Sequence, residues 1–127
     1  MENLPDNPHI YQINLMTWLH ELGNREQQNR TLATIPDREW RYLKDKGMDI
    51  VWLMGIWKRS PDSRKKAQGE PFLVDESRTI LPDFVPEDIV GSPYAVHGYS
   101  CDPILGSMED LRLLKKKNGR NRSFPCP

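Results

Sequence analysis

The sequence lacks three features that would each define a class of protein. Only two of its 127 residues are cysteines, which excludes a disulfide framework and the ligand spacing of a zinc site. Its longest apolar runs, such as Ile50–Gly55, fall far short of the roughly 18 residues that a membrane-spanning helix needs. The polar segment Met1–Pro8 has no apolar core of a secretory signal. We therefore predict a soluble, cytoplasmic chain with no membrane partner, no metal and no cofactor.

The sequence also lacks an excess of charge of either sign, because 18 Lys and Arg residues balance 18 Asp and Glu residues. No net field attracts the chain to nucleic acid or to an anionic membrane. Between Lys115 and the end there are five basic residues and no acid, which would suit nucleic acid or simply the C-terminal end of a helix. No aromatic residue alternates with these cations to stack a base, so we predict a solvated basic tail and no nucleic-acid partner.

The first half of the chain reads as strand, helix, strand. Residues 9–16 alternate in a way typical of a strand, and residues 17–22 predict a short helical turn that Gly23 closes before a polar loop. A second helix is expected from Pro36 to Gly47. The apolar run Asp49–Trp57 then predicts a strand covered on both faces. Two strands joined by a helix predict a parallel pair.

The second half is less regular. Residues 58–92 form a proline-rich excursion with helices expected at 63–68, at 71–81 and from Pro86. Such an excursion is either an elaboration that binds a substrate or an insertion without function. Residues 94–103 predict an extended segment, and Ser107 begins a capping box for a helix that Gly119 should end.

Three of these segments together resemble the alpha-amylase family of glycoside hydrolases. They are the strand IYQINLMTWL, the strand region GMDIVWLMGIWKRSP, and the stretch YAVHGYSCDPILGSMEDLRLLKK, in the order and spacing of that family. The resemblance covers about residues 9–118 and implies an α/β fold that comprises the first two βα units of a (β/α)₈ TIM barrel, incomplete in this chain. Domain boundaries follow from it: a disordered N-terminus at 1–8, the partial barrel at 9–118, and a disordered basic tail at 119–127.

The resemblance also implies chemistry on α-glucosidic bonds. Retaining glycosidases of this kind place two carboxyl groups across the scissile bond. The family's catalytic carboxylates lie on later strands, and even its Asp-x-x-x-Asn-His motif has no counterpart here. No residue of this chain therefore inherits a catalytic role. The doublet Glu109–Asp110 is explained by its place in the first turn of a helix.

What the resemblance assigns is contact with the sugar. Tyr94 matches an aromatic residue that stacks on the substrate, although Ala95 stands where the family commonly has aspartate. His97 and Tyr99 follow on the same extended segment, either facing the same cleft or packing at its rim. Trp57, at the end of the apolar strand, is a further candidate on the cleft side.

We thus predict the N-terminal part of an alpha-amylase-type glycosidase, a truncated or frame-shifted chain that is inactive alone and whose partner is an α-glucan or oligosaccharide. The alternative is a carbohydrate-binding or interaction module without catalysis. Two strands of a barrel also have unpaired outer edges, which predicts non-specific self-association.

Overall fold

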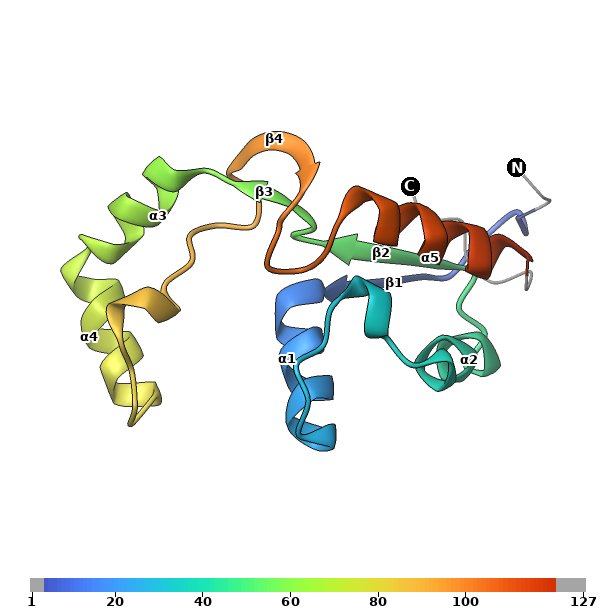
Figure 1. Ribbon diagram of the computed structural model, residues 1–127, viewed down its shortest axis with the longest axis horizontal. Coiled ribbons are helices and arrows are strands. Elements are labelled where there is room, and N and C mark those ends of the chain that lie inside the picture. Colours follow the sequence, from blue (N-terminus) through green and yellow to red (C-terminus); the bar gives the residue numbers. More distant parts are fainter. Residues whose placement is uncertain (1–3, 121–127) are drawn as a thin grey trace. The chain divides into compact units, whose positions relative to one another are not determined.

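The computed structural model describes residues 4–120, and these divide into two compact units (Figure 1). Unit 1 comprises residues 4–56 and 100–120, and unit 2 comprises Trp57–Tyr99. The described residues form five α-helices and two separate two-stranded sheets, without a closed barrel. The chain is therefore a small mixed α/β protein, as predicted.

Unit 1 is built on a pair of parallel strands. β1 (Ile10–Asn14) pairs with β2 (Ile50–Met54), with Ile10 opposite Ile50 and Asn14 opposite Met54, which confirms the predicted parallel pair. The other elements of this unit are α1 (Leu15–Glu26), the 3₁₀ helix η1 (Leu32–Thr34), α2 (Asp37–Asp45) and α5 (Met108–Arg120).

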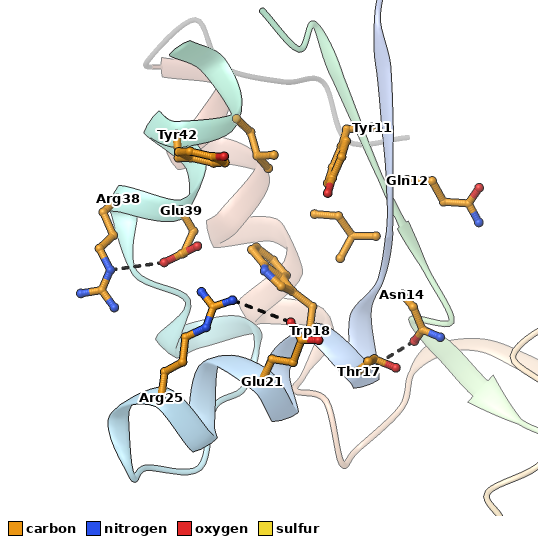
Figure 2. Close-up of a pocket in the computed structure, with 12 residues that line it drawn as sticks. Tyr11, Gln12, Asn14, Thr17, Trp18, Glu21, Arg25, Arg38, Glu39 and Tyr42 are labelled. Carbon is orange, nitrogen blue, oxygen red and sulfur yellow. Dashed lines mark hydrogen bonds and ion pairs between the residues drawn. The ribbon is translucent and has the colours of Figure 1, made fainter. Parts of the chain in front are cut away.

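Helices cover only one face of this sheet. Val51 and Leu53 of β2 are buried, whereas Trp52 between them is 44% exposed. On β1, Tyr11 points toward α1 and α2 and Gln12 points away from them (Figure 2). The prediction that both faces of this strand are covered was wrong. Within the described residues no element packs on the face that carries Trp52. The buried apolar residues that unit 1 gathers against the covered face come from its strands, helices and loops (Ile13, Leu15, Leu19, Leu22, Leu32, Ile35, Trp40, Leu43, Val51, Leu53, Ile56, Cys101, Leu105, Leu114).

The predicted strand Asp49–Trp57 is also too long. Gly55 adopts a φ of 79°, a left-handed conformation that takes the chain out of the sheet after Met54. Trp57 consequently begins a different strand, β3 (Trp57–Arg59), and does not stand at the end of β2.

The first helix is longer than predicted. It starts at Leu15, where the Asn14 side chain accepts a hydrogen bond from Thr17 N, and it continues through Gly23 to Glu26. Gln27 ends it in a left-handed conformation, with φ at 53°. The predicted helix end at Gly23 was wrong. The backbone of Gln28 passes so close to Gly23 that a side chain would not fit there, and this glycine does not end the helix.

The two other helices of unit 1 begin at the predicted start or within one residue of it. α2 follows Pro36 and buries Trp40 and Leu43. At the start of α5, Asp110 N donates to Ser107 Oγ at 3.1 Å while Ser107 N donates to Asp110 Oδ2 at 2.8 Å, which is the expected capping box. α5 extends through Gly119 to Arg120, one residue past the predicted end. Residues 1–3 and 121–127, which include most of the predicted basic tail at 119–127, lie outside the described residues.

Unit 2 contains the other sheet and three helical segments. β3 pairs with β4 (Val96–Cys101, which ends in unit 1), and Ser60 N donates to Ala95 O at 2.8 Å beside this pair. α4 (Pro71–Ile80) and the 3₁₀ helix η2 (Pro86–Asp88) confirm two predicted helix starts, whereas α3 (Pro61–Gln68) starts two residues before the predicted 63. In each of them a proline occupies the first turn, where its missing N–H costs nothing.

Candidate functional site

The predicted sugar-contacting residues all lie in unit 2. The rings of Trp57 on β3 and Tyr99 on β4 meet edge to face, with centroids 5.8 Å apart and planes at 77°. An edge-to-face pair of this kind is a favourable aromatic geometry. The Tyr99 side chain is 81% exposed, so the pair presents an aromatic surface to solvent.

Tyr94 and His97 lie on the chain segment that leads to Tyr99. His97 is exposed and lies two residues before Tyr99 on β4, so both side chains leave the same face of the strand. Tyr94 precedes the strand and is 68% exposed. The structure thus brings Trp57 and Tyr99 together and places Tyr94 and His97 on the same segment.

Hydrogen bonds from α3 and β3 hold the segment that leads to Tyr94. Gln68 Nε2 donates to Pro86 O at 3.0 Å and to Ile89 O at 3.2 Å. Arg59 Nη1 donates to Gly91 O at 3.0 Å. The backbone before β4 is therefore fixed by polar side chains and not by an apolar core.

A tight turn then sets the direction of Tyr94. Tyr94 N donates to Ser92 Oγ at 3.2 Å, and Ala95 N donates to Ser92 O at 3.2 Å. Serine side chains often organise turns in this way. The turn ends one residue before β4, which places Tyr94 at the start of the strand that carries Tyr99.

Unit 1 contains a groove that the sequence did not indicate. It is an open cavity of about 690 Å³ between β1 and the helices α1 and α2 (Figure 2). Aromatic rings and charged side chains alternate around it, and the residues that line it are Tyr11, Gln12, Ile13, Asn14, Thr17, Trp18, Glu21, Arg25, Arg38, Glu39, Tyr42 and Leu43. Three separate segments contribute to it, and each of these segments looks like an ordinary amphipathic strand or helix when read alone. The exposed aromatic residues Tyr11 on β1 and Tyr42 on the polar side of α2 would have been the signals.

Ion pairs and an edge-to-face contact between two tryptophan rings hold the two helices of this groove together. The Glu26 carboxylate, largely buried, pairs with the guanidinium groups of Arg30 and Arg38, and Arg38 also reaches Glu39 Oε1 at 3.2 Å. Trp18 of α1 meets Trp40 of α2 edge to face, with centroids 5.4 Å apart. The groove is thus a preformed feature of unit 1, with walls fixed from both helices.

The buried thiol of Cys101 in unit 1 has a structural role. Burial raises the pKa of Cys101 above its usual range, and the neighbouring carboxylates of Asp102 and Asp110 raise it further. A thiol with a raised pKa is a poor nucleophile at neutral pH. Asp102 is itself used in the turn that follows β4, where its Oδ1 accepts a hydrogen bond from Ile104 N at 3.0 Å.

No family model, curated protein or solved structure matches the chain. Within residues 4–120, no three His, Cys, Asp or Glu side chains come together as a metal site would require. None of the helices in that same range is both long and apolar enough to cross a membrane.

Proposed function

We propose that the chain is the N-terminal part of an alpha-amylase-type glycosidase, comprising the first two βα units of a (β/α)₈ barrel, and that it contacts an α-glucan without cleaving it. Unit 1 follows the order β1, α1, η1, α2, β2, α5, with helices after each of the two parallel strands, and this order supports the architecture. A barrel of this type alternates parallel strands and helices in the same way. The bare second face of the sheet, which carries Trp52, is consistent with strands packed inside a larger barrel.

The observation that carries the proposal is the aromatic pair of Trp57 and Tyr99. These residues are far apart in the sequence, yet their rings meet and Tyr99 remains largely exposed. The apolar C–H face of a pyranose ring stacks on an exposed aromatic ring, and this contact needs no charged partner. Tyr94 offers a second exposed ring on the same segment.

No residue of the chain is given a catalytic role in this proposal. Asp110 is engaged by Ser107 in the capping box, and Glu109 lies beside it in the first turn of α5. A carbohydrate-binding module without catalysis is the second candidate, since Trp57 and Tyr99 meet on a sheet of their own, separate from β1 and β2.

Titration of the 127-residue chain with maltoheptaose, followed by aromatic NMR shifts, tests the contact. We expect a dissociation constant of about 1 mM or weaker, because only a small surface is offered. Tyr99→Ala and Tyr94→Ala should each weaken binding about 3- to 10-fold, the usual contribution of one aromatic contact. Phe72→Ala is the matched control, since Phe72 is an aromatic residue of unit 2 that is 69% exposed on a different element.

Two results would contradict the proposal. Shift changes that are the same in wild type and in both tyrosine variants would show that these rings do not contact the sugar. Release of reducing sugar by the purified chain, lost on substitution of one of its carboxylates, would show that a catalytic residue has been overlooked.

A further inference from the structure

The groove of unit 1 runs along the free edge of a β-strand. Four consecutive residues of β1, from Tyr11 to Asn14, line it. Side chains of consecutive strand residues point to opposite faces, so a cavity that all four line must lie beside the edge of the strand. Within the described residues the sheet has two strands, and β2 occupies the other edge of β1.

The hydrogen-bonding groups that face this edge can be assigned from the pairing. Asp49 N and Ile50 N donate to His9 O at 2.9 and 3.0 Å, and His9 N donates to Asp49 Oδ2, so the backbone of His9 faces β2. Alternate residues of a strand direct their N–H and C=O groups to the same edge. Tyr11 therefore faces β2 as well, whereas the backbone groups of Ile10 and Gln12 face the groove.

β1 carries none of the devices that protect an exposed edge. Natural edge strands use lysine, proline, an inward charge or a bulge to prevent pairing with another chain. The sequence IYQIN of β1 has no charge and no proline, and its register with β2 is regular over all five residues. Such an edge is a template for the addition of a strand.

We propose that β1 pairs antiparallel with β1 of a second copy of this chain, about a two-fold axis at Gln12. Gln12 N of each copy then donates to Gln12 O of the other, and Ile10 stands opposite Asn14 of the second copy. The two-stranded sheets become one sheet of four strands, with the order β2, β1, β1, β2. This proposal goes beyond the proposed function and does not rest on it.

The strand is self-complementary in this register. Tyr11 lies opposite Ile13 of the second copy, on the face where the groove opens, and aromatic rings pair favourably with β-branched side chains across antiparallel strands. Tyr11 is 46% exposed and Ile10 is 58% exposed in the single chain, so pairing removes apolar surface from water.

Charges do not oppose the approach of a second copy. The groove carries two acids and two bases, arranged as the pairs Arg25–Glu21 at 3.9 Å and Arg38–Glu39 at 3.2 Å. The formal net charge of the chain is zero. A second copy therefore meets no excess of like charge, which is what a symmetric interface requires.

Sedimentation of the full chain over a range of concentrations tests the proposal. We expect a monomer–dimer equilibrium that saturates at two copies. Gln12→Pro removes the N–H that faces the groove and spares the backbone bonds to β2, and proline is tolerated at such an edge position. This variant should weaken dimerisation about tenfold or more. Because the dimer is two-fold symmetric, the substitution removes one hydrogen bond donated by each copy.

Gln12→Ala is the matched control, because it keeps the backbone N–H. The Gln12 side chain donates to Met54 Sδ at 3.1 Å within its own chain, so its loss should leave dimerisation nearly unchanged. A chain that stays monomeric, or one that grows beyond dimers and responds equally to both substitutions, would overturn the proposal.

A cross-linking experiment fixes the register and does not depend on how well the proline variant folds. With both native cysteines replaced, Gln12→Cys should form a disulfide-linked dimer, since directly opposed residues in hydrogen-bonded antiparallel pairs have Cα atoms about 5.5 Å apart. Ile10→Cys is the control: its two copies would lie about 14 Å apart along the strands and should not cross-link. Equal cross-linking of both variants, or none in Gln12→Cys, would reject the axis at Gln12.

Discussion

All fourteen buried apolar residues of the described chain lie in unit 1, whereas none of residues 57–99 is buried. Unit 2 also has large apolar residues, because Phe72, Leu73 and Ile80 lie on α4 and Leu81 is the C-cap of this helix. These residues are 39–69% exposed. Unit 1 is therefore held by burial of side chains, and unit 2 by hydrogen bonds to its backbone, such as those that Gln68 and Arg59 donate.

This difference follows from what the helices of each unit bury. The helices α1, α2 and α5 of unit 1 have 12, 9 and 13 residues and share the unit with a parallel pair of strands. The helices of unit 2 have 8 and 10 residues, and a proline starts each of them. Most helical stability comes from packing of an apolar face. The nine-residue α2 buries Trp40 and Leu43, whereas α3 and α4, of similar length, bury no residue, so unit 2 gains little from such packing. The candidate sugar-binding residues thus sit on the unit that has less to stabilise it.

The largest expected effect comes from breaking the core of unit 1. Leu22→Ala should lower the free energy of unfolding by about 2–5 kcal/mol, because Leu22 is only 1% exposed and its truncation leaves a cavity. Leu73→Ala in unit 2 should change it by no more than about 0.5 kcal/mol, since Leu73 is 39% exposed. Urea unfolding followed by circular dichroism measures both. Equal losses in the two variants would refute the contrast between the units.

The next largest effect is expected at one of two glycines, Gly23 inside α1 and Gly69 at the C-terminal end of α3. A Cβ on Gly23, inside α1, would lie 2.6 Å from Gln28 O, where the chain turns back over the helix. Gly23→Ala should therefore destabilise the protein by about 1–3 kcal/mol, although alanine is the better helix former. At Gly69, after α3, the nearest atom would be Lys65 O at 3.4 Å, an ordinary contact.

Gly69→Ala is thus the matched control in unit 2. Its φ of −87° suits alanine, so we expect a change of no more than about 0.5 kcal/mol, or a slight gain from the stiffer unfolded chain. The measurement is again the midpoint of urea unfolding. A gain in stability for Gly23→Ala would show that the backbone at Gln28 can move away at little cost.

The same glycine shows where sequence-based prediction succeeded and where it failed. The starts of α4 and α5 were predicted, and that of α2 to within one residue, because proline and capping residues act within one turn of the helix that they begin. The start of α3 was predicted two residues too late, although Ser60 caps this helix and Pro61 occupies its first turn. The end of α1 was missed because position 23 needs a glycine for its close contact with Gln28. A pattern of residues does not distinguish such a contact from a helix end.

The candidate site shows the same limit. The extended aromatic segment was predicted, but the meeting of Trp57 with Tyr99 depends on the pairing of β3 with β4 and on the break at Gly55 that creates β3. The groove was missed entirely, since β1, α1 and α2 each supply only part of it. Local signals place elements along the chain, whereas a cavity depends on how those elements pack.

The smallest expected effect is on the dependence of stability on pH. Hydrogen bonds from the Ser107 hydroxyl and backbone N–H lower the pKa of Asp110 in the folded chain. A carboxyl group whose pKa is lowered on folding stabilises the protein above its ordinary pKa, and this contribution disappears as the pH falls through the lowered value. Acidification below the ordinary pKa of an aspartate should therefore destabilise unit 1, because α5 contributes to the core of that unit.

Asp110→Asn should remove this part of the pH dependence, and melting temperatures between about pH 2 and pH 7 measure it. Asp62→Asn is the control in unit 2: Asp62 lies in the first turn of α3, where Ser60 Oγ accepts its capping bond from Ser63 N and no acidic residue completes a box. We expect the Asp62 variant to follow the wild-type curve and the Asp110 variant to be flatter at acidic pH. Because Asp110 is solvent-accessible, the difference should be small, and identical slopes for all three proteins would show that the capping box does not couple the fold of unit 1 to pH.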